Sequence, residues 1–161
     1  FRVIRIREVP VVVNRAKQLP KWSAGLINYG VAAVTSAFTW DPEEVTVEID
    51  GKPLPTEPLL ITIIANGQYC GGGMWVAPHA RLDSGYFEVI RIRPLSWSQV
   101  VGILPKVYSG KLASHECVES CRAKAVTITA THPLHVTLDG EIPGRVPATF
   151  RILPRALQIQ V

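Results

Sequence analysis

The sequence has few cysteines and lacks a long apolar run. Its cysteines number three, an odd count, and no signal peptide precedes them (Cys70, Cys117 and Cys121). We therefore do not expect the disulfide framework of a small secreted domain. The most apolar helical candidate, residues 25–38, has polar interruptions and is shorter than the roughly 20 residues that a membrane span needs. These absences favour a reducing, cytoplasmic setting in which any membrane contact is peripheral.

The chain also lacks the familiar nucleotide-binding loops. Neither GxGxxG, nor GxxxxGKS or GxxxxGKT, nor a kinase glycine-rich loop occurs. Gly71, Gly72 and Gly73 could cradle a phosphate, but such a cradle opens a helix, and the segment that follows, 74–78, has the pattern of extended chain. The triplet therefore favours a bulge or a close crossing of strands. The chain by itself shows no ATP site.

Charge gives only a mild bias. Seventeen lysines and arginines against thirteen acidic residues give a net charge of +4, which favours anionic partners. The arginines on predicted strands lack the interleaved aromatic residues of a nucleic-acid platform (Arg2, Arg5, Arg7, Arg91 and Arg93). We therefore expect a solvated sheet face and no nucleic-acid partner. A zinc site from His115, Cys117 and Cys121 is disfavoured, because the C-x3-C spacing lacks the usual paired knuckles.

The composition predicts one domain over residues 1–161. With 47% hydrophobic and 19% charged residues, the chain can bury a substantial core. Its opening, FRVIRIRE, has no initiating Met and alternates like a strand, so we expect a fragment of a longer chain. Strand patterns occur at 43–50, 58–66, 85–93, 123–131, 135–139, 148–153 and 156–161. With helices expected at 23–38 and 96–110, the pattern predicts a mainly β fold: an antiparallel two-sheet β-sandwich with two helices covering its edges.

The second predicted helix has clear ends. Ser96 can cap it, Gly110 can end it, and Pro105 should kink it. Its apolar stripe is predicted from helical spacing (Trp97, Val100, Val101, Leu104 and Tyr108). Such a stripe could lie on a membrane, but burial in the core is the favoured interpretation.

The stretch HPLHVTLDGE leaves two interpretations open. Alternation puts His135, Thr137 and Asp139 on one face of a strand, with Val136 and Leu138 on the other. Asp139-Gly140 is a strong two-residue turn signal, which favours a plain hairpin. Alternatively, Glu141 is a general base that accepts the proton of a substrate hydroxyl. Spacing alone does not choose between them.

The order of motifs adds a resemblance. The block NGQYCGGGMWVAPHA (66–80) and LDGE followed by PATF resemble the C-terminal β-sandwich domain of the diacylglycerol kinase family of lipid kinases, which includes YegS-like, sphingosine and ceramide kinases. The resemblance implies an ATP-binding domain that lies outside this chain. It implies that Glu141 is the proton acceptor, positioned by Asp139 and Gly140. It also implies lipid head-group binding by Asn66, Gly71, Gly72, Gly73, Met74 and Pro78.

The same resemblance raises the question of a metal. Many bacterial members carry an acidic residue that helps to bind a structural Mg²⁺, and Ser84 stands at the matching position here. Because a hydroxyl is a poorer Mg²⁺ ligand than a carboxylate, Asp83 and Ser84 are only a weak candidate pair.

The sequence therefore predicts the lipid-binding and base-supplying domain of an ATP- and Mg²⁺-dependent lipid kinase. An apolar sandwich could hold the acyl chains (Leu59, Ile61, Ile63, Met74 and Val76). Two alternatives stay open: a non-catalytic lipid- or membrane-binding module, and a soluble kinase domain similar to NAD kinases. We also expect peripheral membrane association, and an exposed edge strand could pair two copies in a homodimer.

Overall fold

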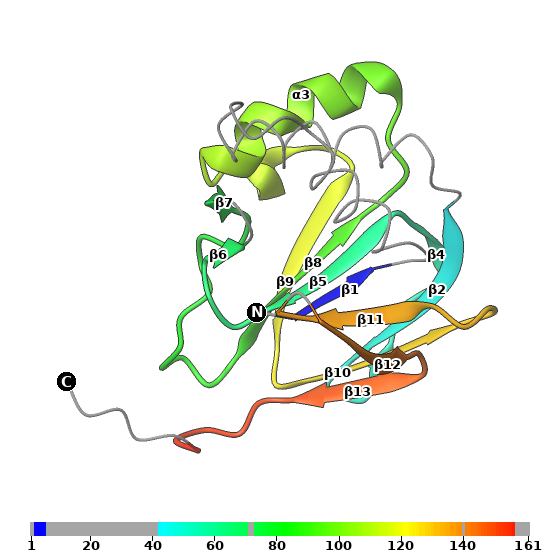
Figure 1. The fold of residues 1–161 in the computed structure, drawn as a ribbon, viewed down its shortest axis with the longest axis vertical. Coiled ribbons are helices and arrows are strands. Elements are labelled where there is room, and N and C mark those ends of the chain that lie inside the picture. Colours follow the sequence, from blue (N-terminus) through cyan, green and yellow to red (C-terminus); the bar gives the residue numbers. More distant parts are fainter. Residues whose placement is uncertain (1, 6–41, 71–72, 140, 157–161) are drawn as a thin grey trace.

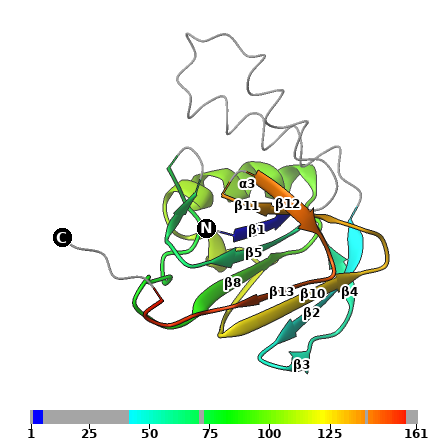
Figure 2. The same ribbon diagram turned by 60° about the horizontal axis from the view of Figure 1, so that its bottom comes forward.

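The computed structural model describes residues 2–5, 42–70, 73–139 and 141–156. Its larger antiparallel sheet has the spatial order β12 (Glu141–Arg145), β11 (His135–Leu138), β1 (Arg2–Arg5), β5 (Ile61–Ala65), β8 (Phe87–Ile92) and β9 (Val118–Ala123). The second sheet runs β13 (Ala148–Arg151), β10 (Ala125–Ala130), β2 (Glu43–Ile49) and β3 (Lys52–Pro53), and β4 (Glu57–Leu59) also pairs with β2. Figure 1 shows the two sheets and Figure 2 shows the layers.

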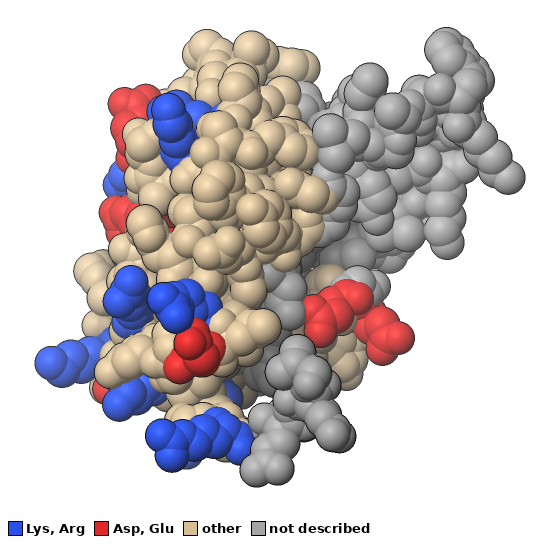
Figure 3. Space-filling view, turned by 90° about the vertical axis from the view of Figure 1, so that its left-hand side faces the viewer, with Lys and Arg blue, Asp and Glu red and all other residues tan. Residues whose placement is uncertain are grey.

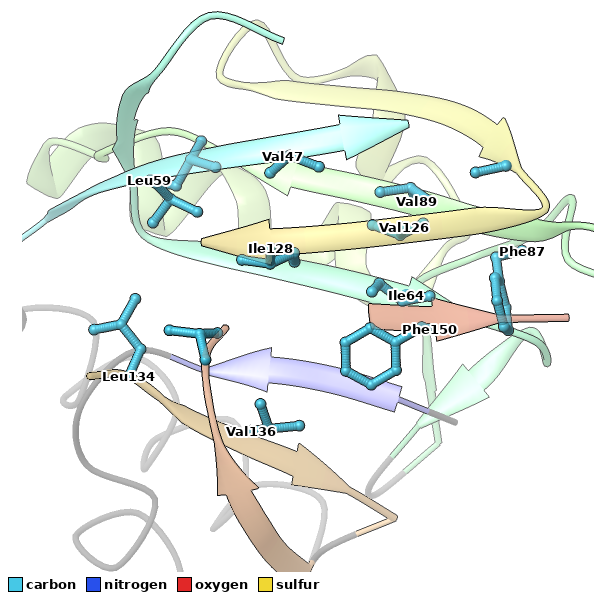
Figure 4. Packing of buried hydrophobic residues seen from close by; sticks show 13 residues of the cluster. Val47, Leu59, Ile64, Phe87, Val89, Val126, Ile128, Leu134, Val136 and Phe150 are labelled. Carbon is cyan, nitrogen blue, oxygen red and sulfur yellow. The ribbon is translucent and has the colours of Figure 1, made fainter. Parts of the chain in front are cut away.

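An apolar core fills the space between the two sheets. Alternating residues of both sheets point inward, because successive side chains of a strand lie on opposite faces. Figure 4 shows this inter-sheet core, whose buried members include Val47, Leu59, Ile64, Phe87, Val89, Val126, Ile128, Leu134, Val136 and Phe150. Burying a side chain of this size contributes about 1.5–3 kcal/mol. The inter-sheet core is therefore what holds the sheets together.

Helix α3 (Trp97–Tyr108) covers the other face of the six-stranded sheet, where we expected helices at the edges. Its Ile103, together with Leu112 of the short 3-10 helix η1 (Leu112–Ser114), packs in a second core on Ile63 and Ile90. The backbone N–H of Ser96 donates to Gln99 Oε1 (2.9 Å), which fixes the predicted start. Within the described part of the chain, no helix is both long and apolar enough to cross a membrane.

Most predicted strands are confirmed, with several differences, among them the short strands β3 and β6 (Tyr69–Cys70), which we did not predict. The run 58–66 is two strands, because the chain leaves the second sheet after Leu59 and enters the larger sheet at Ile61. We did not predict β9, whose four central residues are exposed and show no alternation. Nor did we predict β12, which contains Pro143 and Gly144. The expected helix 23–38 lies outside the described residues, as does nearly all of the expected strand 156–161.

Two predictions about side chains were wrong. On α3, Trp97 is 66% and Val101 62% exposed; Val100 is buried as predicted, and the residue buried with it is Ile103. Arg91 is not part of a solvated face: its side chain is only 13% exposed and forms ion pairs with Glu57 of β4 and Glu119 of β9. In both cases the neighbouring element, which helical or strand spacing does not reveal, decided the burial.

Candidate functional site

The stretch LDGE forms the predicted hairpin. Strand β11 pairs with β12, and Leu138 faces Glu141 across the turn. Asp139 has a positive φ of 48°, which the tight two-residue turn requires. Both carboxylates are exposed, so the hairpin tip carries Asp139 and Glu141 outside the core. The hairpin is confirmed, and it leaves the chemical role of Glu141 open.

Pairing through β1 brings Asn66 to the same edge of the sheet as this hairpin tip. Arg2 pairs with Leu138 on one side and with Ile64 on the other. Strands β11 and β5 therefore run parallel, and Leu138 and Ile64 lie about 10 Å apart, two strand spacings. Both strands end at this edge of the sheet. Asp139 follows β11 and Asn66 follows β5, so both residues lie at the same edge, with β1 between their strands. We call the edge marked by Asn66 and Asp139 the site edge.

Buried polar atoms without partners lie at the site edge and along β11. Within the described part of the chain, Asn66 Oδ1, Thr137 Oγ1 and, at the other end of β11, His135 Nδ1 are buried and form no hydrogen bond. Thr137 and His135 lie on the face of β11 opposite Val136, which packs in the inter-sheet core. Because native proteins pair nearly all buried polar atoms, such atoms indicate places where a ligand or water binds. Sequence reasoning missed Thr137 and His135 as candidates, although alternation had placed both on this face.

The glycine-containing block folds back on itself directly after Asn66. Strands β6 (Tyr69–Cys70) and β7 (Met74–Trp75) form a small hairpin, with the Tyr69 and Trp75 rings stacked at 5.8 Å. Gly73, in the connection, has φ +78°, whereas Gly71 and Gly72 lie outside the described residues. No helix begins after the glycines, so the strand-crossing interpretation fits better than a nucleotide loop.

Local hydrogen bonds hold this block against the sheet. Gln68 Nε2 donates to the carbonyl of Pro78 (3.0 Å), and the N–H of Ala77 donates to the carbonyl of Gln68 (3.1 Å). Met74, half-buried, packs against the core beneath α3, as do Ile61, Ile63 and Val76. Leu59 was wrongly expected to line the same cleft, because it is fully buried in the inter-sheet core.

Asp83 and Ser84 are engaged by their own turn. The Arg81 guanidinium donates to both oxygens of Asp83 (3.1 Å each), which lowers the pKa of that carboxyl below its usual value. The Ser84 hydroxyl lies 2.8 Å from the carbonyl of Arg81. No group of three His, Cys, Asp or Glu side chains among the described residues could hold a metal ion. This geometry does not fit Mg²⁺, and the metal role of Asp83 and Ser84 stays a prediction.

A buried glutamate anchors the segment before these residues. Glu88, on β8, is 4% exposed, and its Oε2 accepts the backbone N–H of His79 (2.9 Å). Burial raises the pKa of Glu88, while the N–H groups of His79 and Ala80 oppose the rise. The carboxyl borders a hollow of about 190 Å³ that is also lined by Cys121 and Arg122. Glu88 thus ties the end of the AP-x-A motif to the sheet.

The structure therefore brings together some of the predicted site residues. Asn66, Asp139 and Glu141 lie at the site edge, with β1 between the strands that carry Asn66 and Asp139, and Gly73, Met74 and Pro78 lie in the block that starts there. The roles assigned to these residues stay predictions.

Curated relatives of this chain are diacylglycerol kinases. The chain is 29% identical over 116 residues to a diacylglycerol kinase of Staphylococcus aureus strain bovine RF122, an alignment covering 72% of this chain and 36% of that protein. It is 24% identical over 149 residues to one of Mycobacterium tuberculosis strain H37Rv, covering 92% and 48%. The chain thus spans between a third and a half of the relatives it matches.

Solved structures share the fold. A protein of Bacillus anthracis strain Sterne superposes with a TM-score of 0.64 at 16% identity, over 95% of this chain and 49% of that one. A diacylglycerol kinase from the same strain gives a TM-score of 0.52 at 15% identity, over 74% and 43%. At these identities the likeness shows the fold alone.

A family model decides the family. The model of the YegS C-terminal NAD kinase beta sandwich-like domain matches residues 8–161, which is nearly the whole chain. The mainly antiparallel sheets agree with that description. The chain belongs to the family of YegS C-terminal NAD kinase beta sandwich-like domains.

Proposed function

We propose that the chain is the lipid-binding and base-supplying domain of an ATP-dependent lipid kinase that phosphorylates a hydroxyl of a diacylglycerol-like lipid. The observation that carries the proposal is the hairpin tip: it presents the Glu141 carboxylate at the site edge, with the unpaired Oδ1 of Asn66 nearby. The names of the curated relatives support the substrate class.

Glu141 supplies the base in this proposal. As the lipid hydroxyl oxygen bonds to the γ-phosphorus of ATP, its proton passes to the Glu141 carboxylate and ADP leaves. Asp139 is a positioning residue, because its left-handed backbone closes the turn that aims Glu141. Because the Glu141 carboxylate is exposed, it can contact a lipid head group, which could not enter the packed core.

The head group binds along the block that follows the site edge, through Asn66, the glycines 71–73, Met74 and Pro78. The nucleotide binds mainly to a part of the protein outside this chain, and Mg²⁺ neutralises its phosphates there. Peripheral membrane association and a homodimer stay proposals of the same kind.

The experiment is transfer of γ-phosphate from ATP to a panel of hydroxyl lipids in mixed micelles, with NAD as a soluble acceptor. It compares this chain with the full-length protein from which it derives. We expect activity on a lipid from the longer protein alone. Transfer of phosphate to NAD and not to lipids would contradict the proposal. So would a folded full-length protein that transfers phosphate to none of these acceptors.

A matched pair of variants tests the base. In the full-length protein, Glu141→Gln should lower kcat by about 10²–10⁴-fold, the usual span for a general base, with unchanged thermal unfolding. Glu44→Gln is the control, since Glu44 is an exposed strand carboxylate of the second sheet. Equal turnover in the Glu141 and Glu44 variants would remove Glu141 from the mechanism.

A further inference from the structure

Five exposed basic side chains gather at the site edge and the adjoining end of the second sheet. They come from segments far apart in the sequence: the loop before β8, the end of β9 with the turn after it, and the end of β13 with the residues after it (Arg81, Arg122, Lys124, Arg151 and Arg155). Figure 3 shows Lys and Arg side chains crowding the lower part of this face. We call these five residues the basic rim.

Backbone contacts hold the segments of the basic rim together. Phe87 pairs with Ala123 where β8 begins and β9 ends. The N–H of Ile152 donates to the carbonyl of Lys124 (2.9 Å), which ties the end of β13 to the β9–β10 turn. Lys124 Nζ lies 5.0 Å from the centre of the Tyr86 ring, in the loop before β8. The basic rim is therefore a fixed platform.

Two leucines project from the same platform. Leu82 is 77% and Leu153 73% exposed, and Tyr86 adds a ring that is 39% exposed. Leu82 lies next to Arg81, and Leu153 lies between Arg151 and Arg155 in sequence. Leu153 thus lies between two cations in sequence, whereas Leu82 lies between Arg81 and Asp83.

Nearby carboxylates neutralise the rim only in part. Asp83 pairs with Arg81. Asp50 Oδ1 accepts the backbone N–H groups of Lys124 (2.9 Å) and Ala125 (2.8 Å), and the Lys124 ammonium lies over the Tyr86 ring instead of pairing with a carboxylate of the described residues. Glu88 lies near Arg122, and Asp139 and Glu141 add two carboxylates at the site edge, so the positive charge of the rim rests on Lys124, Arg151 and Arg155, which form no ion pair among the described residues.

We propose that the basic rim, with Leu82 and Leu153, docks the domain on an anionic lipid bilayer. Cations near such a surface attract its negative head groups, and isolated apolar side chains insert among the acyl chains. A protein partner fits less well, because the centres of protein interfaces are depleted in charged residues. In combination with the proposed function, docking at the site edge brings Glu141 to the bilayer that contains the lipid substrate.

The test is co-sedimentation of the full-length protein with phosphatidylcholine vesicles, with and without phosphatidylglycerol, at low and high salt. We expect binding to the anionic vesicles that salt weakens. The double variant Lys124→Glu/Arg155→Glu should bind them at least tenfold more weakly. The control, Lys111→Glu/Arg145→Glu, reverses two exposed charges away from the rim, because Lys111 follows α3 and Arg145 lies at the end of β12 opposite the hairpin tip, and it should bind like wild type. A second variant, Leu82→Ser/Leu153→Ser, should lower binding several-fold without changing its salt dependence.

Equal binding by the rim and control variants would overturn the proposal, as would wild-type protein that binds neutral and anionic vesicles alike. Binding of the wild type to an acidic polymer such as RNA, but not to vesicles, would also overturn it. Kinase activity on a water-dispersed short-chain diacylglycerol is measured in parallel and should be unchanged in the rim variant. Rim-dependent vesicle binding by a protein that phosphorylates no lipid would support the docking surface and refute the proposed function.

Discussion

The two faces of the six-stranded sheet differ in how they treat polar atoms. The face toward the second sheet is packed with aliphatic and aromatic side chains, and Thr62 adds one buried hydroxyl. The face toward α3 also has an apolar core, but it buries Thr137 Oγ1, Glu88 Oε1 and Trp75 Nε1 without partners. A buried unpaired polar atom costs about 1–3 kcal/mol. The first face leaves one such atom unpaired, Thr62 Oγ1, whereas the second leaves several unpaired and so gives up more stability where a ligand could bind.

The largest expected effect is on the inter-sheet core. Ile128→Ala removes a fully buried side chain and should lower the free energy of unfolding by about 2–5 kcal/mol, measured by urea titration. The control is Val101→Ala on the outer surface of α3, which should change it by less than about 0.5 kcal/mol. Similar losses in both variants would contradict the assignment of the inter-sheet core.

The next effect concerns how α3 holds the glycine-containing block. A Cβ at Gly110 would lie 2.7 Å from Trp75 Cε3, and Gly110 has φ +70°, so Gly110→Ala should cost about 1–3 kcal/mol. Gly102→Ala, within α3 and with open space around it, should be neutral or stabilise by up to about 1 kcal/mol. Thermal unfolding of the two variants, compared side by side, measures the difference. Equal stability would show that Trp75 moves aside at no cost.

A matched pair of threonines compares the two faces directly. Thr137→Val and Thr62→Val each remove a buried hydroxyl without a partner, so both should keep or raise stability, by up to about 1 kcal/mol. If the proposed lipid site includes Thr137, only its variant should raise KM for the lipid, by about two- to tenfold. Steady-state kinetics in mixed micelles measure this. A KM change that is equal in both variants would argue against a face-specific site.

The smallest effect is a pH dependence at Glu88. Because burial raises the pKa of Glu88 in the folded state, the stability it contributes is complete at pH values below 4.5, its ordinary pKa, and is lost as pH rises through the folded pKa. Glu88→Gln keeps the acceptor for His79 and cannot ionise. Its stability, measured by thermal unfolding from pH 4.5 to 7.5, should therefore fall less than that of wild type. If the stability of wild type and of the Glu88→Gln variant fell equally over this pH range, burial would not raise the pKa of Glu88.

Features that depend on neighbours in the sequence were predicted well. The Asp139-Gly140 turn, the ends of α3 at Ser96 and Gly110, and most strands follow from backbone preferences that act over a few residues. The features that were missed depend on partners. Strand β9 is a strand because β8 pairs with it, and Trp97 and Val101 are exposed because α3 rests on Val100 and Ile103.

The candidate site divides in the same way. The sequence alone determined its chemistry: the LDGE carboxylates, the glycine-containing block and the resemblance that links them to lipid kinases. Only the tertiary structure decided that Asn66 lies two strands from Asp139, because that distance depends on the pairing of β1 with both β5 and β11. Likewise, basic residues that are scattered along the sequence form one rim only after three segments meet at the same end of the sheets, since strand pairing joins residues that the chain separates.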